Sequence, residues 1–228
     1  LKFDSNGEFC WGKSTGGNSD DIGNSVVETS DGGYLVTGDT FSYSGGLLVL
    51  KYDSDGVLEW SRSLENDFAM YNYGIQTADN GYVVSGGIEN SNYLFDFFYM
   101  KLDNNGNFMW AKRIPSTNDD TGFAVSQSSD NGLLFTGYTT SYGAGSRDML
   151  MVRTDADGNI PDCEVLESAS LDLVSVAPNV SNINVPVLEI TLQEQIPTFM
   201  NNPEYPETET VCFASIPTRK WTVFAPLP

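Results

Sequence analysis

The chain has 228 residues, of which 40% are hydrophobic and 12% aromatic, so it can bury a substantial core. Asp and Glu number 31 against 11 Lys and Arg, which gives a formal net charge of −20. This charge argues against nucleic acids and anionic membrane surfaces as partners. The sequence contains no His, the commonest general base and metal ligand, and no 18-residue apolar run that would predict a transmembrane helix. These features favour a protein that is not an enzyme.

The chain opens with a segment that occurs four times. It reads LKFDSNGEFCW from Leu1, LKYDSDGVLEW from Leu50, MKLDNNGNFMW from Met100 and VRTDADGNIPD from Val152. The aspartate of each copy is followed three residues later by Gly, and successive copies are 49, 50 and 52 residues apart. This spacing predicts a tight hairpin turn, because the Asp side chain caps the turn and Gly accepts a positive φ.

A second segment occurs three times between the copies of the first. It reads SDGGYLVTGDT from Ser30, ADNGYVVSGGI from Ala78 and SDNGLLFTGYT from Ser129. Together the two segments define a repeat of about 50 residues with four short strands and no helical periodicity. In the first complete repeat we expect the strands at residues 24–29, 34–40, 47–52 and 57–63.

The period and the strand content are typical of an all-β protein built from the four-stranded antiparallel blades of a β-propeller. One blade cannot bury both of its faces, so successive blades must stack. We expect Trp60 and Trp110, in the fourth strands, to be buried between neighbouring blades. Glycines of the second strands, such as Gly38, are expected where neighbouring sheets come close.

The repeats divide the chain into an array and a tail. The predicted array comprises a half-blade at 1–14 and blades at 15–63, 64–113 and 114–163. It is expected to end near Pro161, where the fourth copy of the first segment loses its Trp. Closed propellers have 4–8 blades, so the prediction is a partial ring within a longer protein. Its open edges would need cover from further sequence, a partner chain or the tail.

The pattern W-x-K-x-x-G-G, acidic residues, S/T-D-G-G-Y and K-x-D-x-x-G-x-x-W resembles the surface β-propeller repeats, kelch-like in length, of secreted bacterial, archaeal and protist proteins. Trp11–Gly17 (WGKSTGG), followed by Asp20-Asp21, is the copy nearest to this pattern, whereas Trp60–Asp67 (WSRSLEND) lacks both glycines. The resemblance covers residues 1 to about 163. It implies a propeller fold, an extracellular or cell-surface location and an adhesive role, and it does not identify a ligand.

The tail, residues 164–228, holds eight of the ten prolines. Prolines between short β-prone runs predict either a small β-sandwich or an extended arm that donates strands. The sequon at Asn179 is the only N-glycosylation candidate in the chain.

The three cysteines allow three disulfide pairings. We favour Cys163 with Cys212, because this bridge would pin the tail to the last blade in an oxidising compartment. Cys10 lies between Phe9 and Trp11 and is expected to be buried and inert.

The aspartate turns are also candidate calcium sites, since alternating oxygen ligands resemble the opening of an EF-hand loop. The candidate ligands are Asp4, Asn6, Asp53, Asp55, Asp103, Asn105, Asp155 and Asp157. The glutamate that closes such a loop is missing, so hairpin geometry alone is the alternative explanation of the same residues. No other cofactor is predicted.

Two acidic pairs and a group of tyrosines are further candidates. Asp20-Asp21 and Asp119-Asp120 are possible cation ligands or catalytic carboxylates, but adjacent loop residues rarely reach the separation that glycoside chemistry needs. We therefore expect them to be solvated loop charges. Tyrosines that could stack on sugars, or simply pack in sheets, are Tyr43, Tyr71, Tyr73, Tyr93 and Tyr142.

These observations favour a non-catalytic structural or adhesive extracellular protein. We expect it to assemble into filaments or sheaths by strand exchange, with a tail strand completing a blade of a neighbouring protein. The alternative is a carbohydrate-binding propeller module that uses its exposed tyrosines. A glycosidase or lyase is least favoured, because His and any catalytic motif are absent.

Overall fold

The computed structural model describes residues 1–143, 145–160, 166–183, 189–190 and 221–222. The described residues are all-β, as the sequence predicts, with antiparallel strands and no helix. None of them belongs to a helix long and apolar enough to cross a membrane. The chain divides into two compact units, Lys13–Asn182 and Leu1–Gly12 with Ile183–Pro228.

The larger unit contains three main antiparallel sheets, in which the strands before the tail each pair with the next one along the chain, and a further two-stranded sheet. The first sheet contains β4 (Asp21–Glu28), β5 (Tyr34–Thr40), β6 (Leu47–Tyr52) and β7 (Leu58–Leu64). The second contains β8 (Ala69–Gln76), β9 (Tyr82–Glu89), β10 (Phe95–Leu102) and β11 (Phe108–Ile114). The third contains only β12 (Asp120–Gln127), β13 (Leu133–Thr139) and β14 (Asp148–Thr154) among the described residues. The strands expected at 34–40 and 47–52 are confirmed residue for residue.

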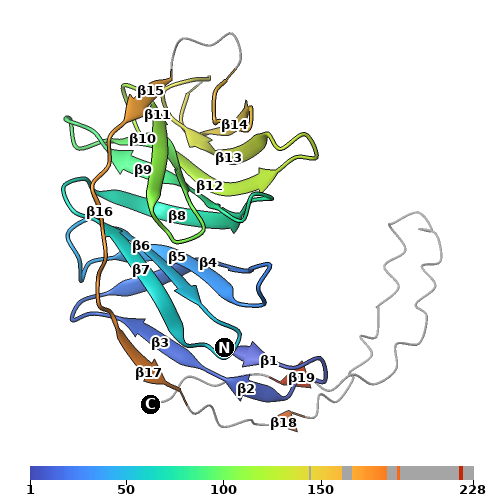
Figure 1. The fold of residues 1–228 in the computed structure, drawn as a ribbon. Helices are drawn as coiled ribbons and strands as arrows, with labels where there is room; N and C mark the ends of the chain where they lie inside the picture. Colours follow the sequence, from blue (N-terminus) through green and yellow to red (C-terminus); the bar gives the residue numbers. More distant parts are fainter. Residues whose placement is uncertain (144, 161–165, 184–188, 191–220, 223–228) are drawn as a thin grey trace, which may run out of the picture. The chain divides into compact units, whose positions relative to one another are not determined.

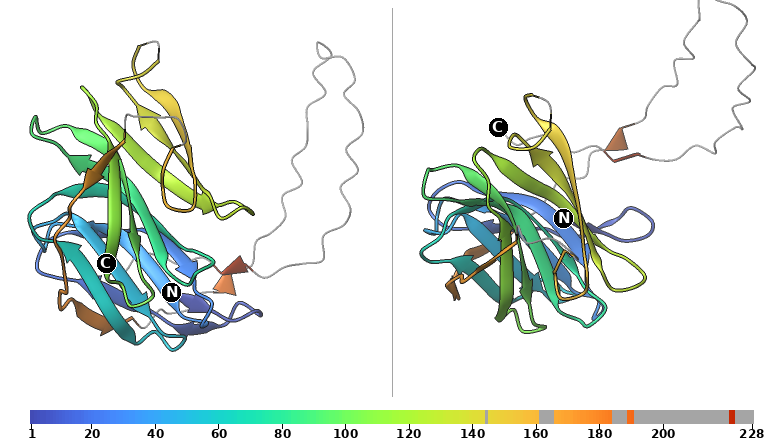
Figure 2. Two further views of the ribbon diagram at one scale, coloured as in Figure 1. Left: turned by 45° about the horizontal axis from the view of Figure 1, so that its top comes forward. Right: turned by 90° about the horizontal axis from the view of Figure 1, so that it is seen from above.

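The three sheets lie one behind another in chain order, and each gap between them is filled by a hydrophobic core (Figures 1 and 2). Leu47 and Val49 of β6 point into the first core, which also contains Val84 and Ile88 of β9. Their neighbour Leu48 points to the opposite face, because successive side chains of a strand alternate. Burial on both faces explains why β6 and β10, the third strands of the first two sheets, are almost continuously apolar.

Part of the tail runs along the outer edges of these sheets, where Figure 1 shows it in orange. Its strands are β15 (Glu167–Ala169) on β11, β16 (Leu173–Val174) on β7 and β17 (Asn179–Asn182) on β3 (Lys13–Gly16). The tail therefore crosses successive sheets in the reverse of their chain order. Leu166, Leu171 and Val176 each contribute an apolar side chain to a different core. The described part of the tail is an extended arm paired with the chain's own strands.

In the smaller unit, β1 (Lys2–Phe3) pairs with β2 (Phe9–Trp11), and β18 (Glu189–Ile190) pairs with β19 (Trp221–Thr222). Cys10 is free and exposed, so the expectation that it is buried is wrong. The reason is strand alternation: the half-buried Phe9 and Trp11 share one face of β2, which places Cys10 on the other.

Gly38, in the second strand of the first sheet, is required for a different reason from the one expected. The pairing of β4 with β5 is interrupted by a register shift between Gly23 and Ser25. A Cβ atom on Gly38 would lie 2.0 Å from the carbonyl oxygen of Ile22, on the paired strand of the same sheet. A β-bulge within the sheet, rather than the approach of a neighbouring sheet, therefore requires glycine here.

Candidate functional site

The repeated aspartate turns share one hydrogen-bond pattern. In each, the Oδ1 atom of Asp accepts from the backbone N–H groups two and four residues later, at 2.7–3.0 Å. The four aspartates are Asp4, Asp53, Asp103 and Asp155. The glycine that follows each has a φ between 72° and 81°. These bonds lower the pKa of Asp4, chiefly through the N–H of Glu8, and that of Asp103, chiefly through the N–H of Asn107.

This pattern accounts for the candidate calcium ligands as hairpin residues. Asn6, Asp55, Asn105 and Asp157 each donate their backbone N–H to the preceding aspartate. Within the described part of the chain, no three His, Cys, Asp or Glu side chains are grouped so as to hold a metal ion. Calcium binding at these turns stays a prediction.

Two of these turns also join neighbouring sheets. Arg62 of β7 donates from Nε to the carbonyl of Gly106 at 2.8 Å and from Nη2 to that of Asn105 at 2.9 Å. Lys112 holds the equivalent position in β11 and donates to the carbonyl of Asp157 at 3.0 Å. Each turn is thus held by a cation from the fourth strand of the preceding sheet.

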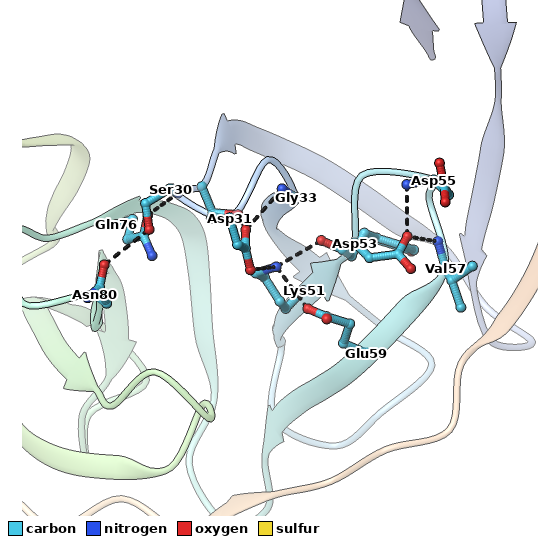
Figure 3. A network of polar contacts seen from close by, with 12 residues as sticks. Ser30, Asp31, Gly33, Lys51, Asp53, Asp55, Val57, Glu59, Gln76 and Asn80 are labelled. Atoms are coloured by element: carbon cyan, nitrogen blue, oxygen red, sulfur yellow. Dashed lines mark hydrogen bonds and ion pairs between the residues drawn. The ribbon is translucent and has the colours of Figure 1, made fainter.

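A buried lysine lies at the same end of the first sheet (Figure 3). Lys51 Nζ donates to Asp31 Oδ2 at 2.9 Å, to Glu59 Oε2 at 2.8 Å and to the carbonyl of Tyr52 at 3.0 Å. Asp31 also accepts from the Thr29 hydroxyl and the Gly33 N–H. The Thr29 hydroxyl, followed by Lys51, holds the pKa of Asp31 far below its usual range. This network ties the turn before β5 to the end of β6.

The same ion pair recurs in the other two sheets. Lys101 Nζ donates to the Thr77 hydroxyl and, at 2.7 Å, to Asp79 Oδ1. Burial opposes ionisation of Asp79, but Lys101, Thr77 and the Gly81 N–H together lower its pKa to about 2. Arg153 pairs with Asp130 in the third sheet. These pairs were not predicted from the sequence, although basic and acidic residues recur at fixed places in the two repeated segments.

Glutamine side chains connect the acidic turns of successive sheets. Gln76 Oε1, at the end of β8, accepts from the backbone N–H of Ser30 at 2.7 Å. Gln127 Oε1, at the end of β12, accepts from that of Ala78 at 2.8 Å. The same glutamine contact therefore joins the acidic turns at both junctions between sheets.

The acidic pairs are built into the structure, so the expectation of solvated loop charges is wrong for their second members. Asp120 is buried, and its Oδ1 atom accepts from the N–H of Thr140 at 2.9 Å. Asp21 accepts from Gly17 and Ser42, each at 2.8 Å. Both residues begin the first strand of a sheet, where their carboxylates satisfy loop N–H and hydroxyl groups.

Aromatic side chains line up at the opposite end of the strands. Neighbouring ring centroids are 5.5–6.5 Å apart, within the range of attractive aromatic contacts. We call this row the aromatic strip; it runs through Phe41, Phe68, Phe95, Tyr71, Phe123 and Tyr138. Phe41, Tyr71 and Phe123 are 49%, 38% and 37% exposed, and the strip draws residues from all three sheets and their loops. Arg147 lies over the Tyr138 ring at 4.4 Å.

The structure brings together only some of the tyrosines proposed from sequence. Tyr71 is part of the strip, and Tyr73 contacts Phe123 at 6.2 Å between ring centroids. Tyr43 is half-buried against the core of the first sheet, where burial and the charge of Asp21 raise its pKa. Tyr93 and Tyr142 are exposed on loops. The phenylalanines of the strip were missed, because they occupy unrelated positions in the repeat.

The remaining candidates are the glycosylation sequon and the favoured disulfide. Asn179 is exposed and pairs with Gly16 at the start of β17. Cys163 and Cys212, the favoured disulfide, lie outside the described residues.

No protein-family model matches the chain, and no curated protein matches it.

Proposed function

We propose that this chain is a non-catalytic adhesive module, built from propeller-type blades, that binds a glycan along its aromatic strip. The proposed blades are the three stacked sheets, which follow the sequence period of about 50 residues. An extracellular or cell-surface location is part of the proposal and rests on the resemblance of the repeats.

The single observation that carries the binding role is the exposure of the strip. Rings that serve only the core would be covered, whereas Phe41, Tyr71 and Phe123 keep a third to a half of their surface in contact with solvent. Exposed aromatic faces in a row suit the apolar faces of successive sugar rings. At the exposed strip, the net charge of −20 favours neutral glycans over acidic ones.

Affinity electrophoresis through gels that contain neutral polysaccharides tests this proposal. Phe123→Ala and Tyr71→Ala should abolish retardation of the protein. Tyr93→Asn is the matched control, because Tyr93 is exposed, contacts no ring of the strip in the described residues and has a positive φ that Asn accepts. Retardation that persists in both strip variants would contradict a glycan-binding strip. So would a wild-type protein that no polysaccharide retards.

Self-association is the second candidate function. Met149 and Met151 of β14 are 88% and 75% exposed, although the corresponding residues of β10, Phe97 and Tyr99, are fully buried against the third sheet. A sheet from a second copy of the chain would cover this face. Light scattering should then report an oligomer for the wild type and a smaller species for Met149→Ser/Met151→Ser. A monomeric wild type excludes this function.

A further inference from the structure

The junction between the second and third sheets contains a pocket at its acidic-turn end. It has a volume of about 370 Å³. Its polar lining includes Lys101, Asp79 and Asn131, and its apolar lining includes Val83 and Leu133. The equivalent junction between the first and second sheets has the same framework of an ion pair and a bridging glutamine. The two junctions can therefore be compared position by position.

The first difference is the residue that begins the second strand of the later sheet at each junction. At the first junction this residue is Tyr82, which is buried and packs edge-to-face on Trp60 with 5.5 Å between the ring centroids. The second junction has Leu133 at the same place in the repeat. Leucine lacks the phenol group of Tyr82, and Leu133 lines the pocket.

The second difference concerns the lysine. Lys51 Nζ has three acceptors, one for each of its protons, and one of them is the Glu59 carboxylate (Figure 3). Lys101 Nζ has two acceptors among the described residues, Thr77 and Asp79. Trp60 pairs with Lys51, and Trp110 pairs with Lys101 in the same register. The residue before each tryptophan is Glu59 in the first sheet and Met109 in the second, so Met109 takes the position of Glu59. Lys101 thus lacks the second carboxylate that its counterpart has.

The third difference is a hydroxyl group. Asn80 Oδ1 accepts a hydrogen bond from Ser30 Oγ at 3.1 Å across the first junction. Ala78 stands where Ser30 would be at the second junction, so Asn131, the counterpart of Asn80, loses this partner. In the described part of the chain, the Asn131 side-chain amide has no hydrogen bond, and it lines the pocket.

We propose that this pocket binds a small carboxylate-bearing molecule. Its carboxylate would accept from Lys101 Nζ, as Glu59 does from Lys51, and its body would lie against Leu133 and Val83 within reach of the Asn131 amide. A hexuronate fits this description, because it combines one carboxylate with hydroxyl groups and a compact ring. The site lies at the opposite end of the strands from the aromatic strip and does not depend on the glycan proposal.

NMR titration of the labelled full chain with sodium glucuronate tests the inference, with glucose and sodium chloride as controls. We expect saturable shifts at Ala78, Asn131 and the Lys101 side chain with glucuronate only. Shifts that sodium chloride reproduces, or no saturation, overturn the proposal.

Variants that introduce residues of the first junction into the second junction make the test specific. Met109→Glu supplies an internal carboxylate, and Leu133→Tyr fills the space; each should weaken binding by about tenfold or more. Met109 is exposed, so Met109→Glu leaves the core intact. The reverse variant, Glu59→Met/Tyr82→Leu, should add a second saturable site whose shifts appear at Ser30 and Asn80. Unchanged affinity in Met109→Glu and Leu133→Tyr, with the fold intact, refutes the assignment to this pocket.

Discussion

The Lys51 ammonium lies 2.9 Å from one carboxylate oxygen of Asp31, and this contact joins the buried end of β6 to the turn that precedes β5. The lysine side chain is only 2% exposed, so the ion pair satisfies a charge that would otherwise be buried without a partner. In the equivalent pair of the second sheet, the Lys101 ammonium lies 2.7 Å from a carboxylate oxygen of Asp79, with one carboxylate fewer around it. The repeat therefore places a buried cation in each of these two sheets.

The Asp79–Lys101 pair makes stability depend on pH. The pKa of Asp79 falls from 3.8 to about 2 in the folded chain, so its ionised form stabilises the fold above pH 4. That contribution is lost as the pH falls from about 4 to about 2. We expect Asp79→Asn to lower the free energy of unfolding by about 1 kcal/mol at neutral pH, a value reduced for the exposure of Asp79.

Urea denaturation of the wild type and Asp79→Asn between pH 7 and pH 2 measures this effect. The difference between the two proteins should shrink toward the acidic end. Glu28→Gln, at an exposed residue with no ion pair among those described, is the control and should show no such trend. A difference independent of pH would show that ionisation of Asp79 does not stabilise the fold.

The tail segment between β15 and β16 should contribute measurably to stability, because it packs on the first core. Leu171 is buried in that core, although it follows the end of β11 at Ile114 by more than 50 residues of sequence. Leu171→Ala should destabilise the chain by about 2–4 kcal/mol, because it leaves a cavity among packed side chains. Val180→Ala in β17, whose side chain is partly exposed, should cost less than about 1 kcal/mol. Equal effects in thermal melts of the two variants would show that the arm does not pack as described.

The bulge in the first sheet provides a matched pair of glycine variants. Gly38→Ala places a Cβ atom 2.0 Å from the Ile22 carbonyl oxygen, a backbone atom that cannot move aside cheaply. We expect a loss of about 2–3 kcal/mol. Gly23 lies directly opposite on β4, and nothing lies within 4 Å of a Cβ built there, so Gly23→Ala should be close to neutral. Similar melting temperatures for both variants would contradict the bulge as the reason for glycine.

Much of the local structure follows from short-range patterns in the sequence. The hairpin at Asp53 was predictable because an aspartate side chain and a glycine three residues later satisfy the turn by themselves. The strands at β5 and β6 were predictable because their apolar residues are bounded by turn signals. The pairing of Lys51 with Asp31 was not predicted, although both recur with the repeat, because pattern alone does not say which side chains of different strands meet.

The sequence by itself determined an all-β chain of repeated strands and turns, since these depend on residues close to one another along the backbone. Only the tertiary structure decided that the tail pairs with the chain's own outer strands, that Phe41, Tyr71 and Phe123 share one strip, and that Leu133 lines a pocket. These relationships join residues from different sheets. The contacts depend on how the sheets stack, which no local pattern of residues encodes.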